Sequence, residues 1–571
     1  MVPASTPWVA RLLLPLLLAA AFWGCAGQVP PGGGPVDAVP PRVILTMPDT
    51  NSVRVSVQSI TLGFSEYVNR RSVEESIFIS PHVGELEFEW DGTEVTARFS
   101  EPLREHTTYV VNVGTDITDI RAGNRMAEGY ALAFSTGDSI DRGSVAGRVF
   151  DEKPEGVMVF AYRLDGLRPD TLDPSRTRPD YITQTGTNGL YTLSHLSLGA
   201  YRVIAVRDEY RDLTYQRQLD QYGVTTGDFA LTASRPAIAD VWFRLAKEDT
   251  ARPFLAGVRT KDRYRIGVRF SEPIDSSSCA RATVAVIDTL SGRSLPVALF
   301  YQDRLQPATA AIMLAAPLDS PATYRVRVRG VADRAGNLID SASPGDLLAG
   351  VLVPDTVRPR ISVRDLRDSV RAVSIEPALE LLFTDPPARM PLEKGVRLMD
   401  SARARVDVRL VWTGPASIAL VPRRPLTTFA WYAIIVTMDS VRSRQGTGYR
   451  DSTYRIRFQT MDVRATGVLS GSVEDRAGSV GKGRVFVTAA STDLNPPRGA
   501  TIDLEQPGPF TFPMLPEGRY GISGFRDADG SGNYSPGLPF PFTPSERFAA
   551  YPDTIRVRAR WTVEGATLRF R

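Results

Sequence analysis

The sequence contains 571 residues, of which 43% are hydrophobic and 23% are charged, and its formal net charge is +3. This length is too great for one hydrophobic core and allows about four or five domains of average size. The apolar fraction is ordinary for folded proteins, which excludes a disordered chain, and the small net charge does not predict a nucleic-acid partner. The 46 glycines and 43 prolines are spread along the chain, which favours short strands separated by turns.

Arginine supplies nearly all of the positive charge. Many arginines alternate with apolar residues, as in Tyr324–Arg329, which reads Y-R-V-R-V-R. In a strand this spacing places them on one face. We interpret such faces as the solvated sides of sheets rather than as phosphate-binding patches.

The N-terminus is predicted to contain an export signal. The apolar run Leu12–Trp23 follows Arg11 and is shorter than the roughly 20 residues that a membrane-spanning helix needs. It fits the hydrophobic region of a signal peptide. Gly24 and Cys25 follow, and this segment resembles the lipobox of bacterial lipoproteins, although Phe22 and Trp23 depart from the usual residues. The resemblance implies cleavage after residue 24 and a lipid on Cys25. An ordinary cleaved signal and a retained anchor are the alternatives.

Residues 25–41 are rich in Gly and Pro and lack apolar periodicity, which predicts an extended tether. Ala26 after the cysteine is compatible with sorting to the outer membrane within the lipoprotein class. The resemblance therefore implies a protein of the cell envelope, anchored by lipid in the outer membrane of a Gram-negative bacterium.

One module occurs three times, at residues 42–137, 249–353 and 355–460. Each copy has a strand of alternating apolar residues that ends in Phe. Ser or Thr follows this Phe, and a carboxylate residue comes next, as in V-R-F-S-E-P (Val268–Pro273). A second landmark contains Tyr, as in A-T-Y-R-V-R-V, and a third is the loop D-R-A-G-N, which the last copy has lost. Constant order and spacing predict a repeated β-sandwich. The landmarks resemble the bacterial Ig-like domain of the S-layer-protein type, which implies a spacer or adhesion module without catalytic residues.

A different module occurs twice, at residues 142–246 and 463–571. Both copies open with a G-x-V strand and continue through L-x-x-G-x-Y into an apolar strand that ends in Arg-Asp. This frame resembles the carboxypeptidase regulatory-like domain, a non-catalytic sandwich of the transthyretin type. Together the patterns predict an all-β protein, a tandem array of five sandwiches after a signal peptide and a tether.

The repeated acids Glu66, Glu272 and Asp385 are candidates for acid–base chemistry. Glycoside hydrolysis needs two carboxylates about 5–10 Å apart, whereas each repeat presents a single acid here, placed to accept backbone N–H groups of the turn. The three histidines show no metal-binding spacing, and no nucleophile elbow or phosphate-binding loop is present. We therefore expect a protein that is not an enzyme and has no cofactor other than the calcium considered next.

A calcium site is predicted in the last module. Asp527, Asp529, Ser531 and Asn533 alternate, and Gly532 stands where a calcium loop needs its turn. Leu538 occupies the position of the usual bidentate glutamate. The alternative is a hairpin tip rich in Gly and Asp.

The function predicted from these features is a non-enzymatic, lipid-anchored scaffold, adhesion module or spacer of the cell envelope. Its partners would be the membrane, through the lipid, and an envelope protein or polysaccharide, but no nucleic acid. The alternatives are a carbohydrate- or calcium-dependent binding protein and an accessory subunit of an envelope secretion or polymer-uptake system.

Overall fold

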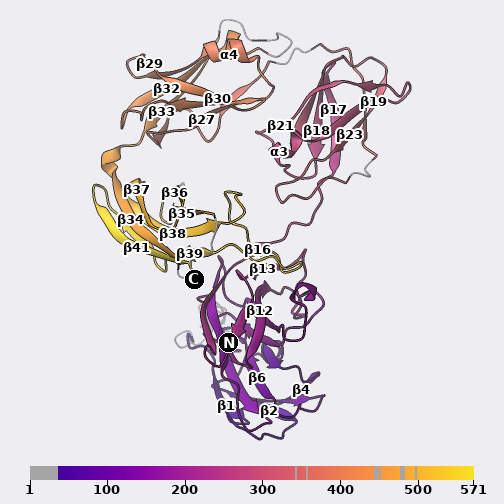
Figure 1. Cartoon of the computed structure of the whole chain (residues 1–571), viewed down its shortest axis with the longest axis vertical. Coiled ribbons are helices and arrows are strands. Elements are labelled where there is room, and N and C mark those ends of the chain that lie inside the picture. Colours follow the sequence, from indigo (N-terminus) through magenta and orange to yellow (C-terminus); the bar gives the residue numbers. More distant parts are fainter. Residues whose placement is uncertain are drawn as a thin grey trace, which may run out of the picture. The chain divides into compact units, whose positions relative to one another are not determined.

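The computed structural model describes residues 37–340, 344–354, 358–442, 448, 452–475, 483–494 and 498–570. The predicted signal peptide, Cys25 and most of the tether lie outside these ranges. Nearly all regular structure in them is β-strand, and the longest helix, α4 (Arg389–Gly395), has 7 residues (Figure 1). The all-β prediction is confirmed. No helix within the described ranges has the length and hydropathy needed to cross a membrane.

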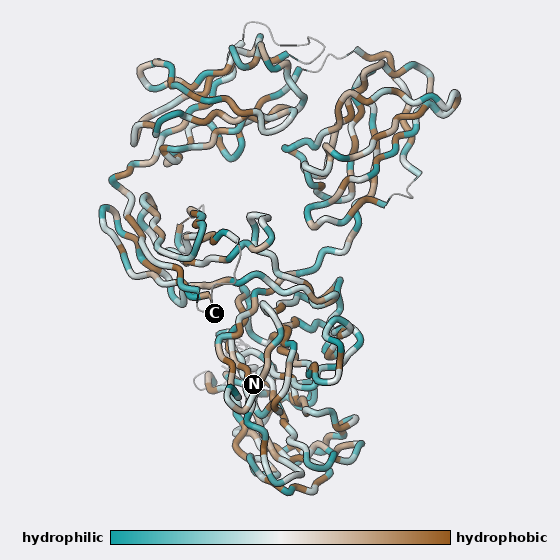
Figure 2. The backbone as a smooth tube through the Cα atoms, viewed as in Figure 1, coloured by the Kyte–Doolittle hydropathy of each residue, from teal (hydrophilic) through white to brown (hydrophobic). Residues whose placement is uncertain are grey.

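The chain divides into two compact units. The first comprises residues 1–163, 180–199 and 230–239, and the second comprises residues 164–179, 200–229 and 240–571. Apolar and polar stretches alternate along the tube in both units (Figure 2). Many small sheets, each with its own buried side, produce this pattern.

In the first unit, residues 43–135 form two antiparallel sheets around one core, with strand orders β1-β2-β5-β4 and β3-β6-β7. The strands are β1 (Val43–Met47), β2 (Ser59–Phe64), β3 (Ile77–Ser80), β4 (Leu86–Asp91), β5 (Glu94–Phe99), β6 (Thr108–Val113) and β7 (Tyr130–Ser135). Ile60, Leu62 and Phe64 of β2 are buried. The residues that alternate along the sequence thus supply one wall of this sandwich.

Residues 255–349 form a second such sandwich, with orders β17-β18-β22-β21 and β20-β19-β23-β24. Its strands are β17 (Leu255–Asp262), β18 (Arg265–Phe270), β19 (Thr283–Asp288), β20 (Ser294–Leu295), β21 (Val297–Gln302), β22 (Thr309–Leu314), β23 (Thr323–Arg329) and β24 (Asp346–Ala349), and α3 (Ser276–Cys279) follows β18. Ile266, Val268 and Phe270 alternate along β18 and lie in its core. Gly267 lies on the opposite face of the sheet and is also buried.

Residues 361–460 form a third sandwich, with orders β25-β27-β31-β30 and β26-β33-β32-β28-β29. Its strands are β25 (Ile361–Val363), β26 (Val370–Val373), β27 (Leu379–Phe383), β28 (Val396–Asp400), β29 (Arg405–Val406), β30 (Val408–Gly414), β31 (Ser417–Pro422), β32 (Trp431–Thr437) and β33 (Thr453–Thr460). One apolar cluster again joins the two sheets.

The region at residues 142–246 contributes strands to both units. In the first unit β8 (Gly143–Phe150) pairs with β11 (Leu190–Leu196), and β9 (Met158–Arg163) pairs with β10 (Tyr181–Gln184). In the second unit β12 (Gly199–Arg207), β13 (Gln221–Val224) and β16 (Ala246–Lys247) are neighbours.

Residues 466–570 form the last sandwich, with orders β37-β34-β41 and β36-β35-β38-β39, and β40 also pairs with β38. The strands are β34 (Thr466–Asp475), β35 (Arg484–Ser491), β36 (Gly499–Leu504), β37 (Pro509–Pro516), β38 (Gly518–Asp527), β39 (Phe548–Ala550), β40 (Ile555–Val557) and β41 (Thr562–Phe570).

The landmark serines and threonine bind the segment that enters each repeat. The hydroxyl of Ser65 accepts a hydrogen bond from the backbone N–H of Arg42 at 3.1 Å. Ser271 accepts one from Phe254 and Thr384 one from Arg360, both at 3.0 Å. The backbone N–H of each landmark residue donates in return to the same entering residue. These pairs satisfy polar groups of the entering segment.

The landmark tyrosines close a loop in each repeat. Their hydroxyls accept hydrogen bonds from backbone N–H groups five residues upstream, at 2.7 Å for Tyr109 and 2.9 Å for Tyr324 and Tyr432. Ig sandwiches have a comparable tyrosine corner, in which a buried ring carries its hydroxyl to the backbone. The recurrence of the motif is therefore explained by folding.

Candidate functional site

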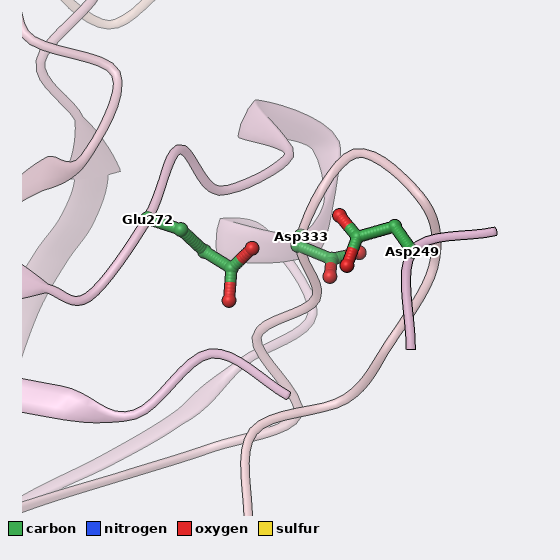
Figure 3. Close-up of side chains that lie close together, drawn as sticks. All are labelled: Asp249, Glu272 and Asp333. Atoms are coloured by element: carbon green, nitrogen blue, oxygen red, sulfur yellow. The ribbon is translucent and has the colours of Figure 1, made fainter. Parts of the chain in front are cut away.

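Three acids from three separate segments meet at one end of the second repeat. One carboxylate oxygen from each of Asp249, Glu272 and Asp333 lies within 4.8 Å of the others. Figure 3 shows the three side chains reaching toward one another from separate segments. Asp249 is exposed, Glu272 is half-buried and Asp333 is buried. The expectation of a single carboxylate at this position is wrong for this repeat.

The loop D-R-A-G-N positions this cluster. The Asp333 carboxylate accepts hydrogen bonds from the backbone N–H of Asn337 at 2.8 Å and from its side-chain amide at 2.9 Å. The same amide donates to the carbonyl oxygen of Asp249 at 2.8 Å. Asn337 therefore joins two of the three acidic segments, which explains why this landmark contains an asparagine.

Burial raises the pKa of Glu272, and the charges of Asp249 and Asp333 raise it further. Both causes disfavour the ionised carboxyl group. Three carboxylates at this separation repel one another unless a proton or a cation reduces their charge. Oxygen ligands of this kind suit a hard cation such as Ca²⁺.

The first repeat has the same arrangement in a looser form. The pKa of Glu66 is raised by burial and then by the charges of Asp37 and Asp119. Asn124 donates its side-chain amide to the carbonyl oxygen of Asp37 at 3.0 Å. Asp119 accepts hydrogen bonds from four successive backbone N–H groups, which lowers its pKa. Asp119 thus binds the N–H groups of its own loop, whereas Glu66 accepts no hydrogen bond from another described residue, contrary to expectation.

The third repeat uses its landmark acid differently. Asp385 is 4% exposed and forms an ion pair with Arg265 of the second repeat at 2.8 Å. Arg265 is equally buried and also pairs with Asp262. Because these side chains are buried, removing any one of them leaves another buried charge without its partner, which lowers stability. Asp385 therefore holds two repeats together and is removed from any shared acidic cluster.

The predicted calcium loop follows β38 in the last sandwich. Asp527 and Asp529 each offer a carboxylate oxygen within 4.8 Å of one from Glu546. Glu546 lies outside the predicted set, in which Leu538 occupies the position of the usual glutamate, and it supplies a third carboxylate. No local spacing could have identified it, because the loop returns to β38 only after residue 540.

The carboxylates of this cluster also bind the loop backbone. Asp527 accepts hydrogen bonds from the N–H groups of Ser531 and Gly532, both at 3.0 Å. Glu546 accepts them from Ala528 at 2.6 Å and Ser535 at 3.0 Å. Hydrogen bonds from the Ser535 and Ser531 side chains lower the pKa of Asp529 to about 2, whereas burial raises the pKa of Glu546.

The two remaining predicted ligands bind each other. The Ser531 hydroxyl donates to the carbonyl oxygen of Asn533 at 2.9 Å, and the Asn533 amide donates to that of Ser531 at 3.3 Å. The structure thus brings Asp527 and Asp529 together with Glu546, while Ser531 and Asn533 shape the turn. Whether calcium binds here stays a prediction.

Within the second unit, the loop that carries this cluster packs on residues 202–225. The Tyr222 hydroxyl donates to the carbonyl oxygen of Gly537 at 2.8 Å, and the Ser545 N–H donates to that of Thr225 at 3.1 Å. The Arg202 guanidinium lies 3.8 Å from the ring centroid of Phe542. These contacts hold the loop in one position.

Cys279 and the histidines are not part of either carboxylate cluster. Burial raises the pKa of Cys279 to about 12, which keeps the thiol protonated. His195 contacts the carbonyl oxygen of Asp141 through Nδ1 at 3.2 Å, and His82 accepts a hydrogen bond from Gly84. Cys25 lies outside the described residues.

Comparison with known proteins places one repeat in a family. The sequence family described as bacterial Ig-like domain matches residues 37–136, in the first repeat. No curated protein matches the chain. The predicted resemblance to bacterial Ig-like domains is confirmed for this repeat.

Solved structures show weak similarity. The N-terminal part of the bacterial S-layer protein SbsC shares 13% identity, over 36% of this chain and 44% of that chain, with a TM-score of 0.17. An L,D-transpeptidase from Mycobacterium smegmatis shares 16%, over 36% and 90%, with a TM-score of 0.14. Native α2-macroglobulin from Escherichia coli shares 10%, over 86% and 42%, with a TM-score of 0.14. The chain thus spans less than half of the first and third of these proteins.

Proposed function

We propose that this protein is a non-enzymatic, lipid-anchored scaffold of the bacterial cell envelope. Its row of sandwiches holds a partner at a distance from the outer membrane or spaces two envelope components. The observation that carries this proposal is the use of the repeated landmarks: Ser65, Tyr109 and their counterparts bind backbone groups of their own repeats. Residues that recur because they bind their own backbone make each module rigid, and the surface residues are then free to vary.

The partner we propose is an envelope protein or polysaccharide. The two flanking modules at residues 142–246 and 463–571 are assigned in this proposal to the transthyretin-like, carboxypeptidase regulatory-like class. In peptidases that domain is non-catalytic, which agrees with a scaffold. A role as accessory subunit of a secretion or polymer-uptake system would use the same surfaces.

The anchor is tested at the mature N-terminus. Cells that express the protein are treated with globomycin, which blocks lipoprotein signal cleavage, and the N-terminal peptide is identified by mass spectrometry. The proposal expects a lipid-modified peptide that begins at Cys25, and accumulation of the precursor under globomycin. The Cys25→Ser variant is the control and should release the protein from the membrane fraction. An unmodified N-terminus at another residue would remove the anchor from the proposal.

A second candidate function is calcium-dependent binding through the loop at residues 527–546. It is favoured by the convergence of Asp527, Asp529 and Glu546, since Ca²⁺ takes several carboxylate oxygens at once. Calorimetric titration of the full-length protein with Ca²⁺ should release heat, and Asp529→Asn should weaken binding because this exposed carboxylate lies in the cluster. Asp553→Asn, an exposed change in the same module, is the matched control. Absence of heat at millimolar Ca²⁺ would end this candidate.

A further inference from the structure

The second repeat has a hollow on the outer face of its sheet β17-β18-β22-β21. The cavity has a volume of about 520 Å³ and lies on the side of the sheet away from the core. Gly257 is paired with Arg269, and Arg259 with Gly267, which in turn pairs with Ala311. Paired residues point to the same face of a sheet. Gly257, Gly267 and Ala311 have small side chains or none, and they therefore leave a depression between the arginine side chains.

The glycines determine the depth of this hollow. A Cβ at Gly257 would have no atom within 4 Å, so space is open above it. A Cβ at Gly267 would lie 3.3 Å from Cε of Lys261 and 3.4 Å from Cγ of Arg259. The aliphatic stems of both cations thus lie over Gly267 and cover it, which explains its burial.

Three cations line the cavity: Arg259, Lys261 and Arg269. Arg259 and Arg269 are exposed, and none of the three forms a salt bridge with another described residue. Asp303 is the one carboxylate among the described lining residues. Burial raises its pKa and the charge of Lys261 opposes this shift, so Asp303 offsets part of the Lys261 charge and positive charge remains in excess. Arg259 and Lys261 are two residues apart on one strand, which separates their Cα atoms by about 7 Å.

A neighbouring arginine on the same face of the sheet, Arg265, does form ion pairs. Arg265 lies four residues before Arg269 on β18, and it is buried against Asp262 and Asp385. Beside it, Tyr301 and Met313 pack with Ala416 of the third repeat. The third repeat therefore covers one half of this face and neutralises its cation, while the other half keeps its charge.

The polar groups around the cations indicate the chemistry of the ligand. Gln306, Thr309 and Thr384 also line the cavity. The Thr309 and Thr384 hydroxyls donate within the protein, to the carbonyl oxygen of Gln306 at 2.9 Å and to Asp385 at 3.2 Å, whereas the Gln306 side-chain amide has no hydrogen bond to another described residue and can bind a hydroxyl group of the ligand. No aromatic side chain is present among the described lining residues, whereas proteins that bind single-stranded nucleic acid stack bases on aromatic rings. Cations spaced along a strand suit a chain of repeated anionic groups.

We propose that this hollow binds a segment of an acidic polysaccharide, with Arg259, Lys261 and Arg269 on its carboxylate or phosphate groups. This names the partner class of the scaffold proposed above and rests on that function. It does not depend on the lipid anchor, so failure of one experiment leaves the other intact.

The test measures binding of fluorescently labelled polysaccharides to the full-length protein in detergent. Polygalacturonate carries carboxylates, phosphomannan carries phosphates, and dextran is the neutral reference. We expect either acidic polymer to bind more tightly than dextran, with an affinity that falls as salt is added, because exposed charges are screened. Arg259→Gln/Lys261→Gln/Arg269→Gln should weaken binding by about tenfold or more, since charge-assisted hydrogen bonds are lost.

The matched control is Arg281→Gln/Arg293→Gln/Arg329→Gln. It removes the same charge from exposed positions of the same repeat outside the cavity and should keep the affinity. Gly257→Val is a second variant, since it fills the open space without changing charge and suits a strand; it should also weaken binding. Gly227→Val, likewise in open space, is its control.

Three results would overturn the proposal. They are equal loss of affinity in both triple variants, equal binding of dextran, and tighter binding of single-stranded DNA than of either acidic polysaccharide. Preference for polygalacturonate over phosphomannan, or the reverse, would identify the anionic group. Thermal unfolding of each variant verifies that the repeat remains folded.

Discussion

The second and third repeats carry the same landmark acid at the end of the same strand, and they use it in opposite ways. Glu272 lies beside two other carboxylates, Asp249 and Asp333, whereas Asp385 is buried against Arg265. Glu272 is therefore held among like charges, whereas Asp385 is neutralised by an arginine of the neighbouring repeat. A repeated residue thus acquires its role from what the tertiary structure places opposite it.

The loss of the D-x-A-G-N loop in the third repeat accompanies this change. In the second repeat Asn337 ties Asp333 to the segment of Asp249. The third repeat has Ser443 and Arg444 in this part of the sequence, outside the described residues. In this repeat Asp385 pairs instead with Arg265 of the second repeat.

The largest effect is expected from Arg265→Met. Asp262 and Asp385 would remain buried without a counter-charge, which should lower the free energy of opening of β18 and β27 by about 3–5 kcal/mol. Hydrogen exchange of the backbone amides in these strands measures it. Arg269→Met, an exposed change on the same strand, should alter it by less than about 0.5 kcal/mol. Equal exchange in the two variants would contradict the role of the ion pair.

A smaller effect is expected from Tyr324→Phe in the second repeat and Tyr432→Phe in the third. Each change removes the acceptor of a backbone N–H and should destabilise its own repeat by about 1 kcal/mol. Thermal unfolding measures the loss of stability, and hydrogen exchange of the backbone amides in each repeat shows which of the two repeats is destabilised. Tyr264→Phe removes a hydroxyl that bonds no other described residue and is the control. An unchanged Tyr324→Phe variant would show that the corner is dispensable.

The smallest effect is expected from Glu272→Gln, and its sign is opposite to that of the first change. Because the pKa of Glu272 is raised in the folded protein, its ionised form costs stability at pH values above that pKa, and the cost vanishes below the unfolded value. In a chelating buffer the variant should therefore unfold at a higher temperature near neutral pH, and the difference should disappear on acidification.

Thermal unfolding as a function of pH measures this difference. Glu105→Gln, an exposed change in the first repeat, should show no such pH dependence. A Glu272→Gln variant that is less stable than the parent at neutral pH would mean that the ionised carboxylate stabilises this loop, which would contradict the repulsion inferred from the cluster.

Much of the fold could be predicted because strands have a period of two. The burial of Ile266, Val268 and Phe270 follows directly from their alternation, and the landmarks recur because they bind their own backbone. The candidate site could be predicted only in part. Asp527 and Asp529 are close in sequence, whereas Glu546 returns from the far end of a long loop, and no local pattern marks it.

Local sequence patterns are enough to predict a chain of successive all-β modules, since strand alternation and turn residues are local properties that a repeated pattern makes visible. Which charges meet depends on the three-dimensional fold: three carboxylates in one repeat, an arginine between two repeats, and around a hollow three cations that form no salt bridge with another described residue. The reason is physical. Electrostatic energy depends on distance in space, and the residues concerned are brought together from strands and loops far apart along the chain.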